Sequence, residues 1–353
     1  MIKMITTQRR IYSAALFYMM VLSSAYIDYE YYNFFKLILL AISSTILLVF
    51  WKRESFSNAL KFKLFLLYSI FLVVFFLREI DSYSLRIVFN LLVTIVCSAA
   101  FLLVGVYKLD LKIGLLFVFA FFVYNYIFNI NLYDGKPQAH AQVFTLVTLA
   151  MVLIPLVKNR IAYFLLLAIV LVSQVRSVLL GFLPVMIIRI LNLSRRITVF
   201  AHMFVVFSAA FGFYYLSVNL DLMQEIFGSS LNSLNWRFYH WNNLFNDFSG
   251  VQWIFGEGLG YSWRITLYIE DFYTDGINYV ASHSNYVKIV TESGLVGLLV
   301  YCVFMFVCYI NSSTIPRALI VFYISYGFYD EGVWLYSMFW TLLLTYEKVL
   351  SDD

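Results

Sequence analysis

Two arginines and one histidine in this very apolar sequence have the chemistry to bind an anionic or sugar ligand. Arg176 lies between two apolar runs, Arg237 lies within an aromatic cluster, and His283 stands where a polar stretch returns to an apolar one. An arginine beside aromatic rings suits a sugar or phosphate at a membrane surface. An imidazole can deprotonate a hydroxyl near neutral pH. These three residues are the first candidates for a functional site.

Each of them also has a structural explanation. The Arg176 side chain could extend to the interface on the outer side of the bilayer, or it could pair with Asp330 or Glu331. The tryptophans around Arg237 could anchor the chain at the interface, and a lone histidine at a helix start, such as His283, is more often structural. A cation inside a membrane is costly and usually marks a ligand path, which favours function for Arg176.

Polar and aromatic side chains near these residues could bind a substrate. The candidates are Trp241, Tyr239, Asn285, Tyr286 and Glu292. Trp241 stands four residues after Arg237, so the two share one face of a helix. Glu292 has a structural alternative, because it stands four residues after Lys288 and could pair with it.

A run of three alternate glycines, Gly256, Gly258 and Gly260, precedes His283. A dinucleotide-binding loop needs Gly-x-Gly-x-x-Gly between a strand and a helix, and neither the spacing nor the context occurs here. We therefore expect a tight turn with exposed backbone N–H groups.

The sequence predicts no metal site and no cofactor. Its four histidines lack the spacing of zinc ligands. Glu270, Asp271 and Asp275 could hold a divalent cation, but a solvated acidic loop is favoured. The three cysteines lie within apolar runs and are expected to be small core residues: Cys97, Cys302 and Cys308.

The elements that position these residues must be membrane helices. Of the 353 residues 63% are hydrophobic and 12% are charged, against about 45–50% and about 25% in soluble proteins. Apolar and polar residues do not alternate within these apolar runs, as they would in the strands of a membrane β-barrel. The net charge of +4 then reflects membrane topology and requires no nucleic-acid partner.

The hydropathy pattern predicts an all-α polytopic membrane protein, with residues 1–353 as a single integral membrane domain. About twelve transmembrane helices are expected, at 11–27, 34–51, 64–78, 85–106, 113–130, 141–157, 161–175, 177–191, 197–219, 284–310, 316–330 and 333–346. The first is predicted to be an uncleaved helix, with a cleaved signal peptide as the alternative. Residues 161–191 are predicted to form a tight hairpin with Arg176 near its tip.

The distribution of Lys and Arg predicts that both termini lie in the cytoplasm, because most of these residues fall in alternate loops. Residues 220–283 then form a large periplasmic loop. Apolar residues recur every three or four positions over 231–248, which predicts an amphipathic helix. Its apolar side could lie at the bilayer interface or pack on other loop residues, and the pattern favours neither.

The order of these motifs resembles the O-antigen polymerase and ligase superfamily. The most specific positions are His283, Asn285, Tyr286, Glu292, Gly294 and Gly297. The resemblance covers roughly residues 161–310. The family commonly has Ser-Arg-Gly where this sequence has Val175-Arg176-Ser177.

The resemblance implies a helix bundle like that of C-type glycosyltransferases and a metal-independent enzyme without a cofactor, since its donor is already activated. The substrates would be undecaprenyl-diphosphate-linked oligosaccharides at the periplasmic face of the bacterial inner membrane. Arg176 and Arg237 would stabilise the leaving diphosphate, and His283 would position or deprotonate the acceptor hydroxyl. Trp241 and Tyr286 would stack on sugar faces.

Two reactions fit this resemblance. A polymerase (Wzy) moves the growing glycan from undecaprenyl diphosphate onto a lipid-linked repeat unit, whereas a ligase moves it onto lipid A core. The divergent context of Arg176 and the modest outer loop favour the polymerase. A polysaccharide flippase or other transporter is a third reading, but it should show repeat halves, which the sequence lacks. The partners are the lipid-linked substrates and the lipid bilayer, with a chain-length-regulating co-polymerase as a candidate.

Overall fold

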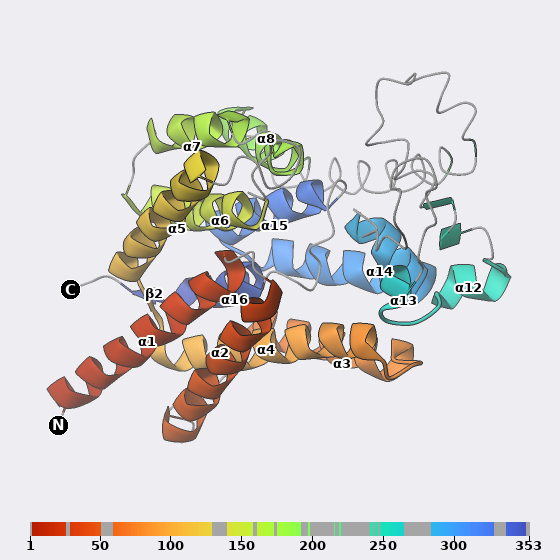
Figure 1. Ribbon diagram of the computed structural model, residues 1–353, viewed down its shortest axis with the longest axis horizontal. Coiled ribbons are helices and arrows are strands. Elements are labelled where there is room, and N and C mark those ends of the chain that lie inside the picture. Colours follow the sequence, from red (N-terminus) through yellow and green to blue (C-terminus); the bar gives the residue numbers. More distant parts are fainter. Residues whose placement is uncertain are drawn as a thin grey trace.

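The computed structural model describes residues 2–25, 29–50, 59–128, 140–157, 161–172, 175–191, 197, 215, 219, 241–242, 244–245, 248–264, 284–327 and 337–350. Helices dominate this part of the chain (Figure 1). They are α1 (Ile2–Ala25), α2 (Tyr29–Phe50), α3 (Leu60–Phe76), α4 (Ser82–Val104), α5 (Lys108–Phe128), α6 (His140–Val157), α7 (Ile161–Val172), α8 (Arg176–Leu191), α12 (Gly250–Phe255), α13 (Tyr261–Arg264), α14 (Asn285–Ile310), α15 (Thr314–Tyr326), α16 (Ser337–Thr345) and the 3₁₀ turn η3 (Tyr346–Lys348). Two short strands, β1 (Val106–Tyr107) and β2 (Val349–Leu350), complete the described elements.

The predicted all-α class is confirmed for the described residues, but the number of spans is not. Two helices, α4 and α14, are long and apolar enough to cross a membrane by themselves. Separate helices α7 and α8 cover residues 161–191, as the predicted hairpin requires, and Arg176 begins the second. The predicted span 197–219 lies almost wholly outside the described residues. Twelve spans therefore remain a prediction.

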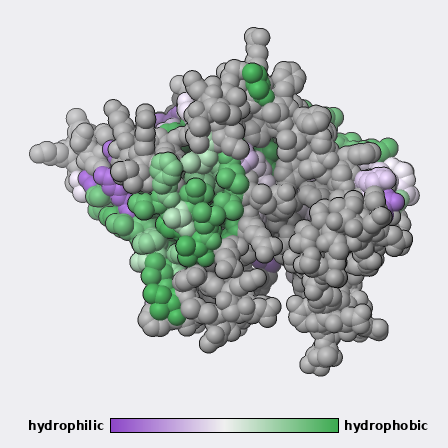
Figure 2. All heavy atoms as spheres, turned by 90° about the horizontal axis from the view of Figure 1, so that it is seen from above, coloured by the Kyte–Doolittle hydropathy of each residue, from purple (hydrophilic) through white to green (hydrophobic). Residues whose placement is uncertain are grey.

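Large apolar side chains cover much of the outer surface of the bundle. Exposed fractions reach 68% at Val74, 66% at Phe75, 66% at Leu116 and 67% at Phe164. Figure 2 shows one side of this surface, where the described residues are mostly hydrophobic and hydrophilic ones gather near its edges. A helix bundle that exposes such side chains is suited to lipid, because water would penalise a surface of this kind. The chain thus has the surface of a membrane protein.

The centre of the bundle is α16, all nine of whose residues are buried. It packs against α1, α3, α4, α6 and α15. Figure 1 places α14 and α16 between α1–α4 on one side and α6–α8 on the other. Aromatic rings fill the core around it: Trp340 lies 5.3 Å from Phe65, and Tyr68 stacks on Phe304 at 5.0 Å, measured between ring centroids.

Several of the described residues that the charge pattern assigns to the cytoplasm lie at one end of the bundle. Strands β1 and β2 pair in parallel there. Lys61 forms an ion pair with Glu347 at 3.0 Å, and the Arg10 guanidinium lies 5.5 Å from the centre of the Tyr107 ring. Residues far apart in the sequence but of one predicted side therefore meet at one end.

At the opposite end, α4 begins with a reciprocal cap. The Asp81 carboxylate accepts hydrogen bonds from the N–H groups of Tyr83 at 3.1 Å and Ser84 at 2.8 Å, while Ser84 Oγ accepts from Asp81 N–H at 3.0 Å. These bonds satisfy donors that a helix start otherwise leaves unpaired. They fix the connection between α3 and α4, on which the candidate site is built.

The cap makes a testable contribution to stability. Replacing Asp81 by alanine should lower the free energy of unfolding by about 1 kcal/mol, because the first-turn N–H groups lose their acceptor. Asp81→Asn keeps an acceptor oxygen and should retain most of the stability. Thermal unfolding of the purified protein in detergent measures both variants. An asparagine variant as unstable as the alanine variant would contradict the role of the cap.

Candidate functional site

The side chains of the three predicted catalytic residues are not among those that the structure describes. Arg176 is described in its backbone only, as the first residue of α8. Arg237 and His283 fall outside the described residues. So do Tyr239, Asp330 and Glu331, and the acidic cluster Glu270, Asp271 and Asp275. The site is therefore built from the segments that flank these residues.

A glycine-containing loop, residues 256–260, connects α12 to α13, and we call it the glycine loop. The prediction that its N–H groups are exposed is wrong. Glu257 N–H donates to the Thr291 carbonyl at 2.8 Å and Gly258 N–H to the Glu292 carbonyl at 2.9 Å, while Leu259 N–H donates to the Phe76 carbonyl at 2.8 Å. The loop thus binds α14 on one side and the end of α3 on the other, and its donors serve the fold.

Close backbone contact explains why glycines occupy this loop. Gly256 has φ +64°, and a Cβ placed on it would lie 2.5 Å from the carbonyl carbon of Glu292. On the other side of the same contact, Gly294 has φ +65° and ψ −167° and interrupts the helical backbone of α14. A Cβ on Gly260 would lie 2.8 Å from the Ser84 nitrogen, at the cap of α4. Side chains at these positions would separate the segments.

Substitutions of single glycines test the backbone contact between the glycine loop and α14. Gly256→Ala should lower the free energy of unfolding by at least about 2 kcal/mol, because alanine disfavours positive φ and its Cβ meets backbone atoms that cannot turn away. Gly250→Ala is the matched control, since a Cβ there meets nothing within 4 Å. Unfolding measured by heating in detergent should separate the two variants. Equal stability would show that the loop does not depend on this contact.

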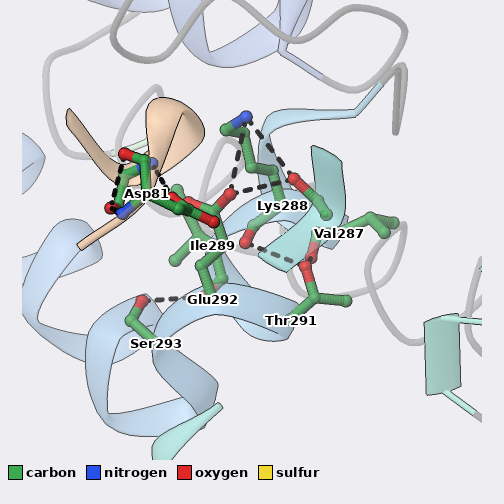
Figure 3. Close-up of polar contacts among 9 residues, drawn as sticks. Asp81, Val287, Lys288, Ile289, Thr291, Glu292 and Ser293 are labelled. Carbon is green, nitrogen blue, oxygen red and sulfur yellow. Dashed lines mark hydrogen bonds and ion pairs between the residues drawn. The ribbon is translucent and has the colours of Figure 1, made fainter. Parts of the chain in front are cut away.

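A buried polar cluster lies beside the glycine loop, in the first half of α14 (Figure 3). Lys288 Nζ lies 3.5 Å from Glu292 Oε1, which also accepts a hydrogen bond from Ser262 Oγ at 2.9 Å. Lys288 Nζ reaches Ser262 Oγ at 3.5 Å. All three residues are buried. The predicted pairing of Glu292 with Lys288 is confirmed, whereas no sequence pattern pointed to Ser262.

The cluster joins the short helix α13 to α14. Ser262 belongs to α13, directly after the glycine loop, and Glu292 belongs to α14. The Glu292 carboxylate is already engaged by two polar groups of the protein. Its predicted role in binding substrate therefore requires that it exchange one of these contacts for a substrate hydroxyl.

The chain directly after His283 is held against α15. Asn285 N–H donates to the Gly327 carbonyl at 2.8 Å, and the Tyr286 hydroxyl donates to the Ile324 carbonyl at 2.7 Å. Asn285 and Tyr286 are both buried. Sugar stacking on the Tyr286 ring would thus require neighbouring side chains to move. What these residues do here is fix the first turn of α14.

The predicted amphipathic helix is described at only a few positions. Trp241 is buried, and the Phe245 ring stacks on Trp253 of α12 at 5.0 Å, with Phe248 packed edge-on against both. Phe245 and Phe248 pack on other loop residues, so the second alternative for the apolar stripe holds at these two positions. A sugar could reach the Trp241 face only after rearrangement of this packing.

The described residues contain no group of three or more His, Cys, Asp or Glu side chains that could hold a metal ion. The three cysteines are free: Cys97 and Cys308 are buried, and Cys302 is half-buried. They serve as core residues, as predicted.

The hairpin of α7 and α8, the glycine loop, α13 and most of α14 lie within one stretch of the sequence. That stretch matches a known family. Residues 161–302 match the O-antigen ligase family model. No curated protein and no solved structure gives a significant match to the chain.

The match confirms the resemblance to the O-antigen polymerase and ligase superfamily. The O-antigen ligase region begins with α7 and ends within α14. It contains all three predicted catalytic residues, Arg176, Arg237 and His283, together with the glycine loop and the buried cluster. The match supports a role of the protein in polysaccharide biosynthesis at a membrane, as a glycan-transferring enzyme.

Proposed function

We propose that this protein is an O-antigen or polysaccharide polymerase of the Wzy type. It transfers the growing glycan from undecaprenyl diphosphate onto a lipid-linked repeat unit, at the periplasmic face of the bacterial inner membrane. The observation that carries the proposal is the match of residues 161–302 to the O-antigen ligase family, over a stretch that holds two arginines and a histidine.

In this proposal Arg176 and Arg237 stabilise the departing diphosphate. The C1–O bond of the donor sugar breaks, and its electron pair stays on the diphosphate, whose negative charge grows in the transition state. Preorganised guanidinium groups stabilise such charge through paired hydrogen bonds. His283 takes the proton of the acceptor hydroxyl as that oxygen bonds to C1. The reaction uses no metal ion and no ATP.

The proposed orientation places both termini in the cytoplasm. It is supported by the end of the bundle where Lys61 meets Glu347 and Arg10 meets Tyr107, all of which the charge pattern assigns to that side. The glycine loop and the cap of α4 lie at the opposite end of α3 and α4. The periplasm is therefore the side proposed for the site.

Ligation is the second candidate, because the matched family model is described as O-antigen ligase. The donor and the leaving group are the same in both reactions, and only the acceptor differs. The same two arginines and histidine would serve a lipid A core acceptor.

An assay with purified components separates the candidates. The protein is incubated with a cognate undecaprenyl-diphosphate-linked repeat unit, without metal or ATP, and the products are resolved by chain length. A ladder formed from the repeat unit alone establishes polymerisation. Transfer that needs added lipid A core establishes ligation. Absence of transfer under both conditions, with the glycan carried intact across proteoliposomes, would replace both with transport.

A further inference from the structure

α14 bends sharply at Gly294. Tyr286 and Tyr301 stand 15 positions apart, and a straight helix would separate them by about 22 Å. The centroids of their rings are only 6.4 Å apart, so the two halves of α14 fold toward each other. Gly294 interrupts the helix between them and lies against the backbone of α12, beside the glycine loop. The first half, residues 285–293, therefore leads up to the glycine loop and begins farther inside the bundle.

Packing against α3 gives the depth at which α14 begins. The Phe76 carbonyl binds the glycine loop, and Tyr68 precedes Phe76 by eight residues, a rise of about 12 Å along α3. Between ring centroids, Tyr301 lies 6.3 Å from Tyr68 and 6.4 Å from Tyr286. The start of α14 is therefore about 12 Å from the glycine loop, within the bundle.

The C-terminal end of α15 holds this start in place. Asn285 N–H donates to the Gly327 carbonyl at 2.8 Å, and Ser284 Oγ donates to the same carbonyl at 3.5 Å. Ser284 directly follows His283, and a peptide link keeps neighbouring Cα atoms about 3.8 Å apart. The bonds to Gly327 therefore fix the segment to which His283 is joined.

α8 and α15 run in opposite directions. Beyond Gly294, α14 runs away from the glycine loop, and α15 follows it after three residues, so α15 runs back toward the loop. α6 begins beside the end of α1 that lies away from Arg10, where Thr145 Oγ1 donates to the Ser24 carbonyl at 3.2 Å. α7 and α8 follow α6 after connections of three residues each, so these helices alternate in direction and α8 runs as α6 does.

This antiparallel packing brings the backbone of Arg176 level with Gly327. A Cβ on Gly181 of α8 would lie 3.0 Å from the Phe322 carbonyl oxygen of α15, so these two residues lie at one level. Arg176 stands five residues before Gly181, and Gly327 stands five after Phe322, a rise of about 7.5 Å on each helix. The end of α15 is thus level with the start of α8 and bonded to the start of α14.

Gly327 is a glycine for reasons of space. Its φ of −63° and ψ of −11° are helical, so its backbone conformation suits any residue with a side chain. A Cβ there would lie 2.6 Å from Asn285 Nδ2 and 3.1 Å from Asn285 Cβ. A side chain at position 327 would therefore push Asn285 away from α15.

We propose that Gly327 is a positioning residue of the transfer reaction, because it admits Asn285 against the end of α15 and so sets the place of His283 relative to Arg176. The inference rests on the proposed function, in which the arginine stabilises the leaving diphosphate and the histidine takes the acceptor proton. Both groups act around one sugar carbon, and a misplacement of about 1 Å can cost about 10²-fold in rate.

Kinetics of glycan transfer test the proposal. In Gly327→Ala, kcat should fall at least about tenfold, while KM for the lipid-linked repeat unit changes less than about threefold. Asn285→Ala makes room for the new methyl group. Whatever Asn285→Ala itself costs, adding Gly327→Ala to it should lower kcat by less than about twofold. Gly250→Ala, whose Cβ meets nothing within 4 Å, is the control and should keep both constants.

Hydrogen exchange gives a readout that needs no catalysis. The Asn285 amide hydrogen, which is bonded to the Gly327 carbonyl, should exchange at least about tenfold faster in Gly327→Ala than in the unaltered protein. The amide hydrogens of α3 and α4 should keep their exchange rates, because the displacement is confined to the start of α14.

Each result decides for or against the proposal. Full kcat in Gly327→Ala overturns it. So does a loss that persists at full size beside Asn285→Ala, or faster exchange throughout α3 and α4, since Gly327 would then only support the fold. Should Gly327→Ala fail to fold alone, the comparison of Asn285→Ala with the double variant still decides, and a double variant that also fails to fold overturns the proposal.

The same preparations separate this inference from the proposed function. A protein that forms a glycan ladder at an unchanged rate in Gly327→Ala retains the function and loses the positioning role. A protein that forms no ladder but transfers glycan to lipid A core loses the polymerase function. The kinetics of that transfer then test Gly327, because the same arginine and histidine would serve it. If neither transfer occurs, both proposals are wrong.

Discussion

Arg176→Ala, Arg237→Ala and His283→Ala are each expected to reduce glycan transfer by about 10²–10⁴-fold while leaving the protein folded in the membrane. The arginines stabilise charge that grows on the diphosphate only in the transition state, so their removal should lower kcat more than it raises KM. His283→Ala removes the proton acceptor, an effect typically of about 10²–10⁴-fold. Initial rates of ladder formation measure all three variants.

Two further variants sharpen this result. Arg176→Lys keeps the charge but loses the paired hydrogen bonds of a guanidinium, so it should recover only part of the activity. Arg317→Ala is the matched control, because that side chain donates to the Tyr309 carbonyl at 3.3 Å, at the end of the bundle proposed to face the cytoplasm. If all three alanine variants transferred glycan at the full rate, the site would have to lie elsewhere in the chain.

The second large effect is expected at the buried ion pair. Glu292→Gln should lower the free energy of unfolding by about 3–5 kcal/mol, because it removes the carboxylate that faces the buried Lys288 ammonium. The double variant Lys288→Met, Glu292→Gln removes both charges and should recover much of that loss. Thermal unfolding in detergent, arranged as a double-mutant cycle, measures the coupling.

A matched substitution at the other end of the bundle serves as the control. Glu347→Gln removes a carboxylate that lies closer to its lysine, 3.0 Å from Lys61, but is 56% exposed. Solvent screens that charge, so the loss should be at most about 1 kcal/mol. Equal losses for Glu292→Gln and Glu347→Gln would show that burial does not set the strength of these pairs.

Local sequence patterns predicted what depends on local chemistry. Apolar runs predicted the helices, and a spacing of four residues predicted the pair of Lys288 and Glu292. They could not predict contacts between distant segments. The N–H of Leu259 binds the carbonyl of Phe76, and Ser262 binds Glu292, because tertiary packing brings these residues together. Neither periodicity nor composition indicates such contacts between distant segments. For that reason the sequence predicts exposed N–H groups in the glycine loop.

Local patterns also could not predict the contact between α2 and α4 in the N-terminal half of the bundle. Lys36 and Asn90 are 54 residues apart, and only the parallel packing of α2 and α4 joins them. No local pattern in the sequence indicates this partner for Lys36. Family resemblance did not help either, because the match begins at residue 161.

The position of α16 has a consequence for biogenesis. This central helix follows all the other described α-helices in the sequence, yet its nine residues contact helices that leave the ribosome much earlier, including α1, α3, α4 and α6. Synthesis proceeds from the N-terminus, so these helices enter the membrane before the segment that fills the space between them exists. Before α16 is inserted and Trp340 packs against Phe65, the space between the earlier helices is not filled by this segment. The described core therefore closes only after α16 has been synthesised, and until then the nascent chain should be open to membrane chaperones and proteases.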